Sequence, residues 1–171
     1  MQSPIFNNLK KISFIILVSI SLGKTVEGAS MSLFSKEKHE VVVCSPMEGV
    51  ITYQGEPVAD AKVERWLKWK DEDGERDYVF TNNEGRFSLP IVEDTVSLSP
   101  LTQFVMYQEI VVIYKEKEYP IWAKSKREVG IYEELKGIPA GFSCELTEEF
   151  KRVDGVGRGM FMTLCKWKEI K

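Results

Sequence analysis

Apolar and polar residues alternate along this chain over short runs, which is typical of β-strands that are buried on one side. The clearest run covers residues 61–69, where small and apolar side chains share one face and lysine and glutamate side chains occupy the other. Two positions depart from the alternation, because Arg65 falls on the apolar face and Trp66 on the polar face. The run predicts a strand with one buried and one exposed face, interrupted at these two residues.

Similar runs recur along the chain and are separated by turn residues. We expect further strands over residues 40–44, 49–53, 78–81, 86–89, 91–98, 110–114, 119–123, 142–146 and 159–167. Asparagine and glycine tolerate positive φ, so residues 82–85 predict a hairpin between two of these strands. Residues 115–118 predict the charged tip of a second hairpin. Residues 125–136 have apolar positions three apart before a glycine and predict one short helix. The pattern therefore predicts an all-β, antiparallel β-sandwich of about seven or more strands with at most one short helix.

Residues 1–28 have the layout of a signal peptide. Lys10 and Lys11 precede an apolar run of eleven residues, and small residues follow near Gly28. The run is shorter than the roughly 20 apolar residues that span a membrane, so we expect no stable span in the mature form. The sequence predicts export to the periplasm or secretion.

The domain boundaries follow from this leader. We expect an N-terminal extension with the first strand over residues 29–48 and the sandwich domain over residues 49–171. Two alternatives stay open: the leader can remain as an uncleaved membrane tether, or Met31 can be the true start of a cytosolic protein.

The charge and the histidine count limit the possible functions. The chain has 23 Lys and Arg residues against 26 Asp and Glu residues, a formal net charge of -3. Nucleic acid is not an expected partner, because binding it requires a basic face. The single histidine, His39, lies in a polar stretch and has no evident Ser or Cys partner for a catalytic triad. We expect a protein that is not an enzyme and has no cofactor.

Three cysteines allow at most one intrachain disulfide. Cys144 and Cys165 can pair in an oxidising compartment if their strands are neighbours, which would add roughly 3 kcal/mol of stability. Three buried thiols, with Cys44 as the third, are the alternative. The spacing matches no zinc motif, so we expect no metal site.

Residues 49–63 combine a strand, a turn with glycine and proline, and the start of a second strand. Thr81, Gly85 and Phe87 follow in the pattern T-x-x-x-G-x-F. Over residues 49–90 the chain resembles a carboxypeptidase regulatory-like, or transthyretin-like, domain. Residues 44–49 are also similar to the start of small uncharacterised bacterial proteins with this kind of domain.

The resemblance implies a transthyretin-like, immunoglobulin-like sandwich of seven strands that serves as a folding or interaction module. It does not imply a peptidase, because the zinc site of carboxypeptidases lies in a separate domain. Catalytic relatives of this sandwich depend on several histidines, whereas this chain has one.

The candidate binding surface combines an aromatic ring with charged neighbours. Trp66 lies on the polar face of its strand, and a charged loop follows over residues 71–76. The candidate binding residues are Trp66, Lys68, Asp71, Asp73 and Arg76. Exposed rings beside charges can dock a protein or stack on a sugar. The alternative is that most rings lie in the core and Trp66 is half covered.

The sequence thus predicts a non-catalytic, exported β-sandwich module that binds a protein or a cell-envelope component. A carbohydrate-binding module is the alternative, and it would need two or three coplanar rings on one surface. A small cytosolic binding protein that starts at Met31 is the other.

Overall fold

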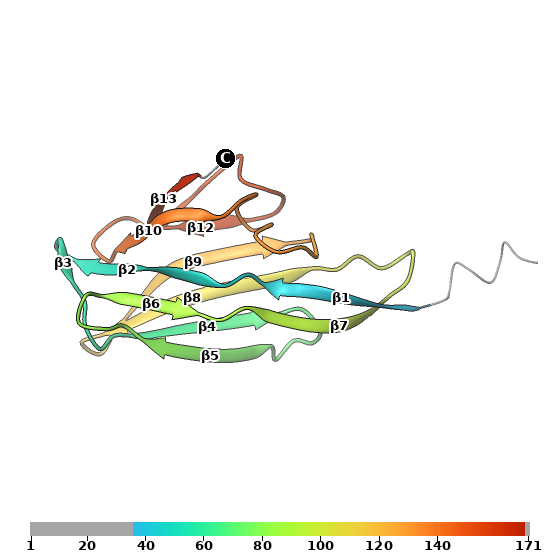
Figure 1. The fold of residues 1–171 in the computed structure, drawn as a ribbon, viewed down its shortest axis with the longest axis horizontal. Coiled ribbons are helices and arrows are strands. Elements are labelled where there is room, and N and C mark those ends of the chain that lie inside the picture. Colours follow the sequence, from blue (N-terminus) through green and yellow to red (C-terminus); the bar gives the residue numbers. More distant parts are fainter. Residues whose placement is uncertain (1–35, 170–171) are drawn as a thin grey trace, which may run out of the picture.

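The computed structural model describes residues 36–169, and the expected signal peptide lies outside this range. All thirteen regular elements in the described range are β-strands, so the all-β prediction is confirmed. The strands form two packed sheets and a two-stranded ribbon, with β1, β2, β6 and β7 in front of β4 and β8 in Figure 1.

The larger sheet has six strands and is antiparallel throughout, in the order β11-β12-β9-β8-β4-β5. Its strands are β4 (Lys62–Lys68), β5 (Glu75–Phe80), β8 (Met106–Tyr114), β9 (Lys117–Lys126), β11 (Lys151–Arg152) and β12 (Phe161–Thr163). The predicted β8–β9 hairpin is confirmed, with a two-residue turn at Lys115 and Glu116. Both turn residues have positive φ, 51° and 61°, as a tight hairpin turn requires.

The second sheet has the order β13-β10-β2-β3, and β6 also pairs with β2. Its strands are β2 (Met47–Tyr53), β3 (Glu56–Pro57), β6 (Arg86–Leu89), β10 (Pro139–Glu145) and β13 (Cys165–Glu169). Strand β10 runs parallel to β2, with Cys144 beside Ile51. Within residues 36–169 this is the single parallel pair, so the sandwich is not purely antiparallel.

The remaining two strands, β1 (Glu37–Cys44) and β7 (Val92–Leu98), extend the β2–β6 pair into a longer ribbon. Met47 lies opposite Leu89 in β2–β6, and Cys44 lies opposite Val92 in β1–β7. Prolines follow Ser45 and Leu89 at the two breaks. Because proline has no N–H to donate, it interrupts the ladder there without changing the direction of the ribbon.

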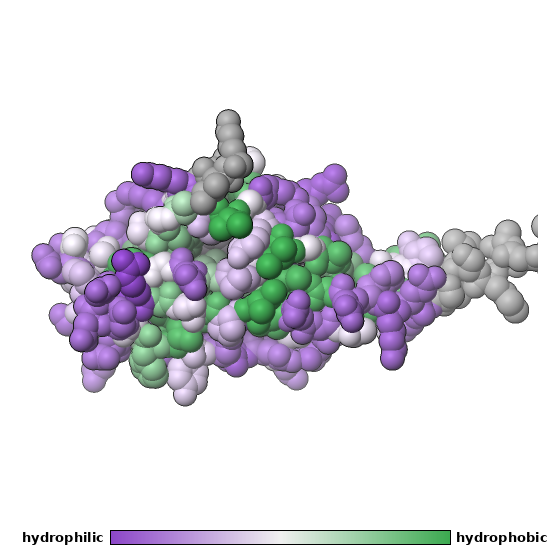
Figure 2. Space-filling model, in the orientation of Figure 1, coloured by the Kyte–Doolittle hydropathy of each residue, from purple (hydrophilic) through white to green (hydrophobic). Residues whose placement is uncertain are grey.

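The apolar faces of the two sheets meet in a core around Trp122. This side chain is fully buried, and its ring packs edge-on against Phe142 at 5.8 Å and Phe161 at 4.6 Å. A second cluster beneath the β1–β7 ribbon contains Val43 and Met106. Figure 2 shows polar residues over most of the face that carries β1 and β2, with apolar surface near its middle.

The hairpin predicted at residues 82–85 is wrong. The turn itself forms, because the Asn82 N–H donates to the Arg86 carbonyl at 2.9 Å. However, β5 pairs with β4 and β6 pairs with β2, so this turn carries the chain from one sheet to the other. Gly85 has φ 72°, and a Cβ there would lie 2.4 Å from the Ile51 carbonyl oxygen. Turn chemistry is local, whereas the pairing of the flanking strands is decided by distant strands.

The helix predicted over residues 125–136 is also wrong. Strand β9 continues to Lys126, and residues 127–138 then form a strap of bends and turns that leads to β10. Lys126 and Glu134 form an ion pair at 2.9 Å. In a helix these residues would lie about 12 Å apart along the axis. The buried ion pair therefore excludes a helix, and Tyr132 and Lys136 adopt positive φ instead.

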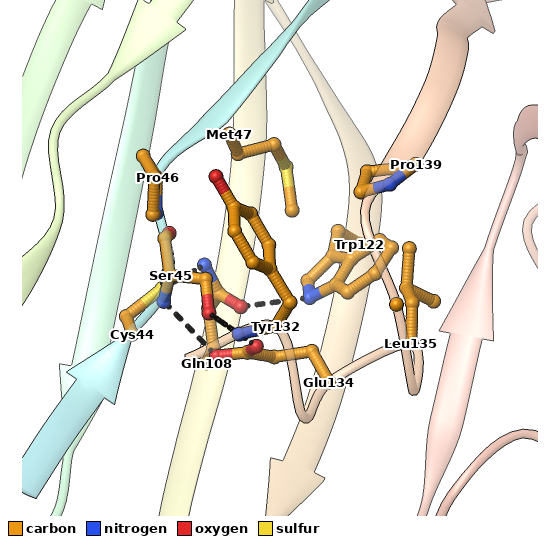
Figure 3. A pocket seen from close by; sticks show the side chains of 11 residues that line it. Cys44, Ser45, Pro46, Met47, Gln108, Trp122, Tyr132, Glu134, Leu135 and Pro139 are labelled. Carbon is orange, nitrogen blue, oxygen red and sulfur yellow. Dashed lines mark hydrogen bonds between the residues drawn. The ribbon is translucent and has the colours of Figure 1, made fainter. Parts of the chain in front are cut away.

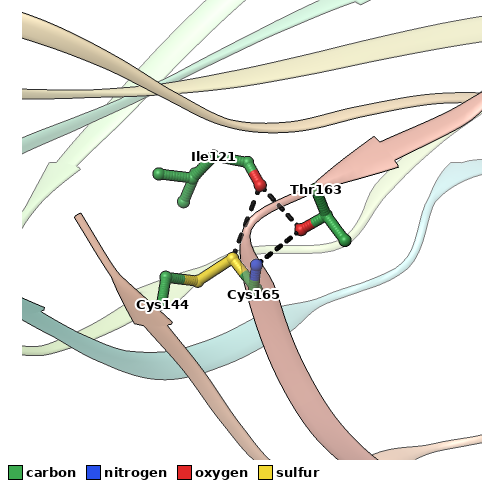
Figure 4. Close-up of a disulfide and its surroundings, with 4 residues drawn as sticks. All are labelled: Ile121, Cys144, Thr163 and Cys165. Atoms are coloured by element: carbon green, nitrogen blue, oxygen red, sulfur yellow. Dashed lines mark hydrogen bonds between the residues drawn. A yellow bond between two sulfur atoms is a disulfide. The ribbon is translucent and has the colours of Figure 1, made fainter. Parts of the chain in front are cut away.

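The strand predicted over residues 159–167 is two strands in different sheets. Strand β12 pairs with β9, the chain changes sheet at Leu164, and β13 pairs with β10. This change places Cys165 opposite Cys144, where the two residues form a disulfide with a Cα–Cα distance of 4.1 Å. Figure 4 shows the Thr163 hydroxyl between the Cys165 N–H and the Ile121 carbonyl. These two hydrogen bonds attach the point where the chain changes sheet to β9.

We expect the double variant Cys144→Ser/Cys165→Ser to lose about 3 kcal/mol of unfolding free energy, because the unfolded chain regains the freedom of a 21-residue loop. Urea unfolding of the oxidised protein and of the variant measures this difference. As a control, a reductant should lower the stability of the wild-type protein and leave the variant unchanged. Equal unfolding midpoints for oxidised protein and variant would contradict the expectation.

Candidate functional site

The structure places Trp66 and Arg76 side by side on the outer face of the six-stranded sheet. They are directly opposite each other on β4 and β5. The Arg76 guanidinium carbon lies 5.4 Å from the centre of the Trp66 ring, within the range of a cation–π interaction. On the other side, Tyr107 of β8 packs edge-on against Trp66 at 5.8 Å. The ring is thus half buried, between a cation and a second ring.

The charged loop after β4 folds back onto the Trp66 ring. The indole N–H of Trp66 donates to the backbone carbonyl of Asp73 at 3.0 Å. The Asp71 carboxylate accepts from the Gly74 N–H at 2.9 Å, which closes the loop. A Cβ at Gly74 would lie 2.4 Å from the indole nitrogen, so only glycine fits against the ring edge. Asp73 therefore contributes its backbone rather than its carboxylate to this site.

A groove of about 470 Å³ opens beside Trp66 and is the candidate binding site. Its aromatic walls are Trp66, Trp69 and Tyr107, and Lys68 and Asp71 supply charge. Three of the five predicted site residues therefore line one groove. Arg76 lies outside the groove, against the Trp66 ring, and the Asp73 carbonyl accepts from the indole N–H at the edge of the ring.

Sequence reasoning missed a buried polar cluster that anchors the strap. Figure 3 shows the Ser45 hydroxyl and the Glu134 carboxylate close together, with the backbone nitrogen of Tyr132 beside them. The Ser45 hydroxyl donates to Glu134 Oε2 at 2.6 Å and accepts from the Tyr132 N–H at 2.6 Å. The fully buried Lys126 donates to Glu134 Oε1 at 2.9 Å and to the Val42 carbonyl at 3.0 Å. These bonds fix the strap against the junction of β1 and β2.

A second chain of polar contacts crosses the interior from Trp122 to Arg65. The Trp122 indole donates to the Gln108 side-chain oxygen at 3.0 Å, and Gln108 Nε2 contacts the Cys44 sulfur at 3.0 Å. Arg65 contacts the same sulfur at 3.6 Å and forms a two-pronged ion pair with Asp77. Burial raises the pKa of Cys44 to about 12, so its thiol is protonated at neutral pH and is not activated as a nucleophile.

The polar cluster surrounds a cavity too small for a substrate. The cavity is about 20 Å³ and has room for roughly one water molecule. Within residues 36–169, every buried side-chain nitrogen and oxygen has a hydrogen-bond partner. No group of three potential metal ligands occurs in that range, and no helix there is long and apolar enough to cross a membrane. The contacts of the cluster hold the strap in place.

One sequence signal pointed toward this interior network. Arg65 interrupts the apolar face of residues 61–69, and the structure buries it there with 0% exposure. The burial of Lys126 and Glu134 had no such signal, because it depends on the path of the strap.

Residues 47–149 match the model of a family described as a domain of unknown function, DUF6795. The chain belongs to this family. The DUF6795 match begins at β2 and ends after β10, so it includes the Trp66 groove, Lys126 and Glu134. Ser45 and Cys165 lie outside the matched range. No curated protein and no solved structure matches the chain.

We expect Glu134→Gln to destabilise this DUF6795 protein by about 3–5 kcal/mol, because it leaves Lys126 buried without a counter-charge. Replacing both residues, as in Lys126→Met/Glu134→Leu, should cost less than the sum of the two single changes. Urea unfolding of Lys126→Met, Glu134→Leu and the double variant measures this coupling. Glu133→Gln on the same strap is the matched control, because Glu133 pairs only with the half-exposed Lys136. Equal costs for Glu134→Gln and Glu133→Gln would contradict the assigned role.

Proposed function

We propose that this chain is a non-catalytic, exported module of transthyretin-like architecture that binds a protein of the cell envelope through the Trp66 groove. The observation that carries the proposal is the groove itself, in which three aromatic side chains line an open surface next to charged groups. Aromatic side chains with polar ends supply much of the binding energy at protein interfaces. Lys68 and Asp71 at the same groove would orient the partner.

The interior chemistry supports a role without catalysis. Ser45, Lys126 and Glu134 satisfy one another, and the Cys44 thiol stays protonated. His39, the only histidine, lies exposed on β1. The groups that are available to a ligand therefore lie on the outer surface.

Two observations support export. Residues 1–28 carry the charged, apolar and small-residue regions of a signal peptide. The Cys144–Cys165 disulfide is of the kind that persists in oxidising compartments and is rare in the cytosol. A start at Met31 would place this disulfide in a reducing compartment.

The ring geometry favours a protein over a sugar as ligand. Trp66 and Tyr107 meet at 71°, and Tyr78 and Phe80 on the same sheet meet at 82°. Stacking on a sugar would require coplanar rings, and these two pairs are nearly perpendicular.

We expect Trp66→Ala to weaken binding of the native partner by about 30-fold, which corresponds to the roughly 2 kcal/mol of an interface hot spot. The chain is purified from its host with its partners, these are identified by mass spectrometry, and affinities are then measured with purified components. The same purification reports the mature N-terminus.

Leu101→Ala is the matched control, because Leu101 is an exposed apolar residue that does not line the groove. Circular dichroism verifies that both variants are folded. If Trp66→Ala and Lys68→Glu retain every partner, the groove is not the binding site. Binding to a glycan array that is lost in Trp66→Ala would support the carbohydrate-binding alternative instead.

A further inference from the structure

Strand β5 is an edge strand whose outward backbone groups can be identified. In the described range it is hydrogen-bonded to β4 alone and ends the order of the six-stranded sheet. The Thr81 N–H donates to the Ala61 carbonyl, so the backbone of Thr81 faces the β4 side. Bonding alternates along an antiparallel ladder, so the N–H and C=O groups of Arg76, Tyr78 and Phe80 face away from β4.

Of the features that usually prevent strand pairing, this edge has charged side chains, including the inward-facing Asp77, and lacks the others. It contains neither lysine nor proline, and its register with β4 is regular. Its charged side chains are already engaged within the chain: Glu75 with Lys70, Arg76 with Glu64, and Asp77 with Arg65. Tyr78 and Phe80 are 58% and 59% exposed. An open edge with exposed aromatic residues and internally paired charges is suited to pairing with another strand.

The sequence of β5 is complementary to itself in one antiparallel register. A twofold axis at Tyr78 places Arg76 opposite Phe80 of a second copy, which forms a cation–π pair on each side of the axis. The inward-facing Asp77 then lies beside Val79 of the second copy. An axis at Asp77 would instead place two carboxylates opposite each other, and like charges in direct opposition are destabilising. An axis at Val79 would lose the Arg76 pairs and shorten the ladder.

We propose that two copies of this chain form a homodimer by antiparallel pairing of β5 with β5, with the twofold axis at Tyr78. The six-stranded sheets of the two copies would join into one continuous sheet, an isologous arrangement typical of twofold dimers. On the outer face, Trp66, Arg76 and Phe80 of the second copy would form one row. The side chains that line the Trp66 groove come from β4, the loop after it, Val105 and β8, and none of them belongs to β5.

Sedimentation velocity of the purified chain over a dilution series tests this proposal. We expect a dimer that dissociates on dilution, with a dissociation constant raised at least about tenfold by Tyr78→Lys, because two like charges would face each other at the axis. Tyr78→Pro should have the same effect, because it removes an outward N–H and leaves the β4 ladder intact. Leu101→Lys is the matched control and should leave the dissociation constant unchanged. Circular dichroism verifies the fold of each variant.

Cross-linking tests the register. Tyr78→Cys should give a covalent dimer on mild oxidation, because the two Tyr78 positions face each other at the axis. Lys115→Cys, at the β8–β9 turn, should not. A wild-type chain that is monomeric at every concentration would overturn the proposal, as would a dimer that both Tyr78 variants leave intact.

The dimer goes beyond the proposed binding function, and the two can fail separately. Loss of the dimer in Tyr78→Lys with native partners retained would leave the groove proposal standing. Loss of partners in Trp66→Ala with the dimer retained would leave the dimer standing.

Discussion

The ion pair between Lys126 and Glu134 determines how the chain passes between the two sheets. Lys126 is the last residue of β9 in one sheet, and β10 of the other sheet begins shortly after Glu134. Ser45 binds the same carboxylate from the junction of β1 and β2. The connection from β9 to β10 is fixed by these buried polar contacts rather than by a helix. A buried ion pair of this kind adds little net stability over apolar packing, but the loss of one partner is costly.

The strands could be predicted from alternation because each strand has one buried and one exposed face. The same reasoning predicted Trp66 on the outer face, where the structure places it. Pairing could not be predicted in this way: residues 82–85 have the chemistry of a hairpin turn, yet β5 and β6 each pair with a strand distant in sequence. The helix predicted over residues 125–136 was wrong for a similar reason. Apolar spacing is a local signal, whereas Glu134 bonds to Ser45, which is distant in the sequence.

The candidate site could likewise be predicted only in part, because the sequence indicates which residues are near one another along the chain but not which of their atoms make contact. The sequence predicted that Trp66 and charged side chains, including those of Asp71 and Asp73 in the loop over residues 71–76, form the binding surface. In the structure the Asp73 carbonyl holds the ring, a contact that any residue with the right backbone conformation could make. The inner network is organised oppositely, since it depends on specific side chains: Glu134 accepts from the Ser45 hydroxyl, and Gln108 accepts from the Trp122 indole. The buried polar groups bond to one another, whereas Trp66, Lys68 and Asp71 line a groove at the surface.

The change of sheet at Leu164 has a consequence for the order in which the molecule can be completed. Strand β2 is made early, but its parallel neighbour β10 comes much later in the chain, and β13, which covers the far side of β10, comes last. During synthesis from the N-terminus, the second sheet therefore keeps an open side until almost the whole chain has emerged. Cys144 has no partner during this period, and Cys44 is the only other thiol available to it. Cys44, the last residue of β1, is buried against Leu67 and Met106, which precede Cys144 in the chain, and this burial would protect the chain from the wrong disulfide.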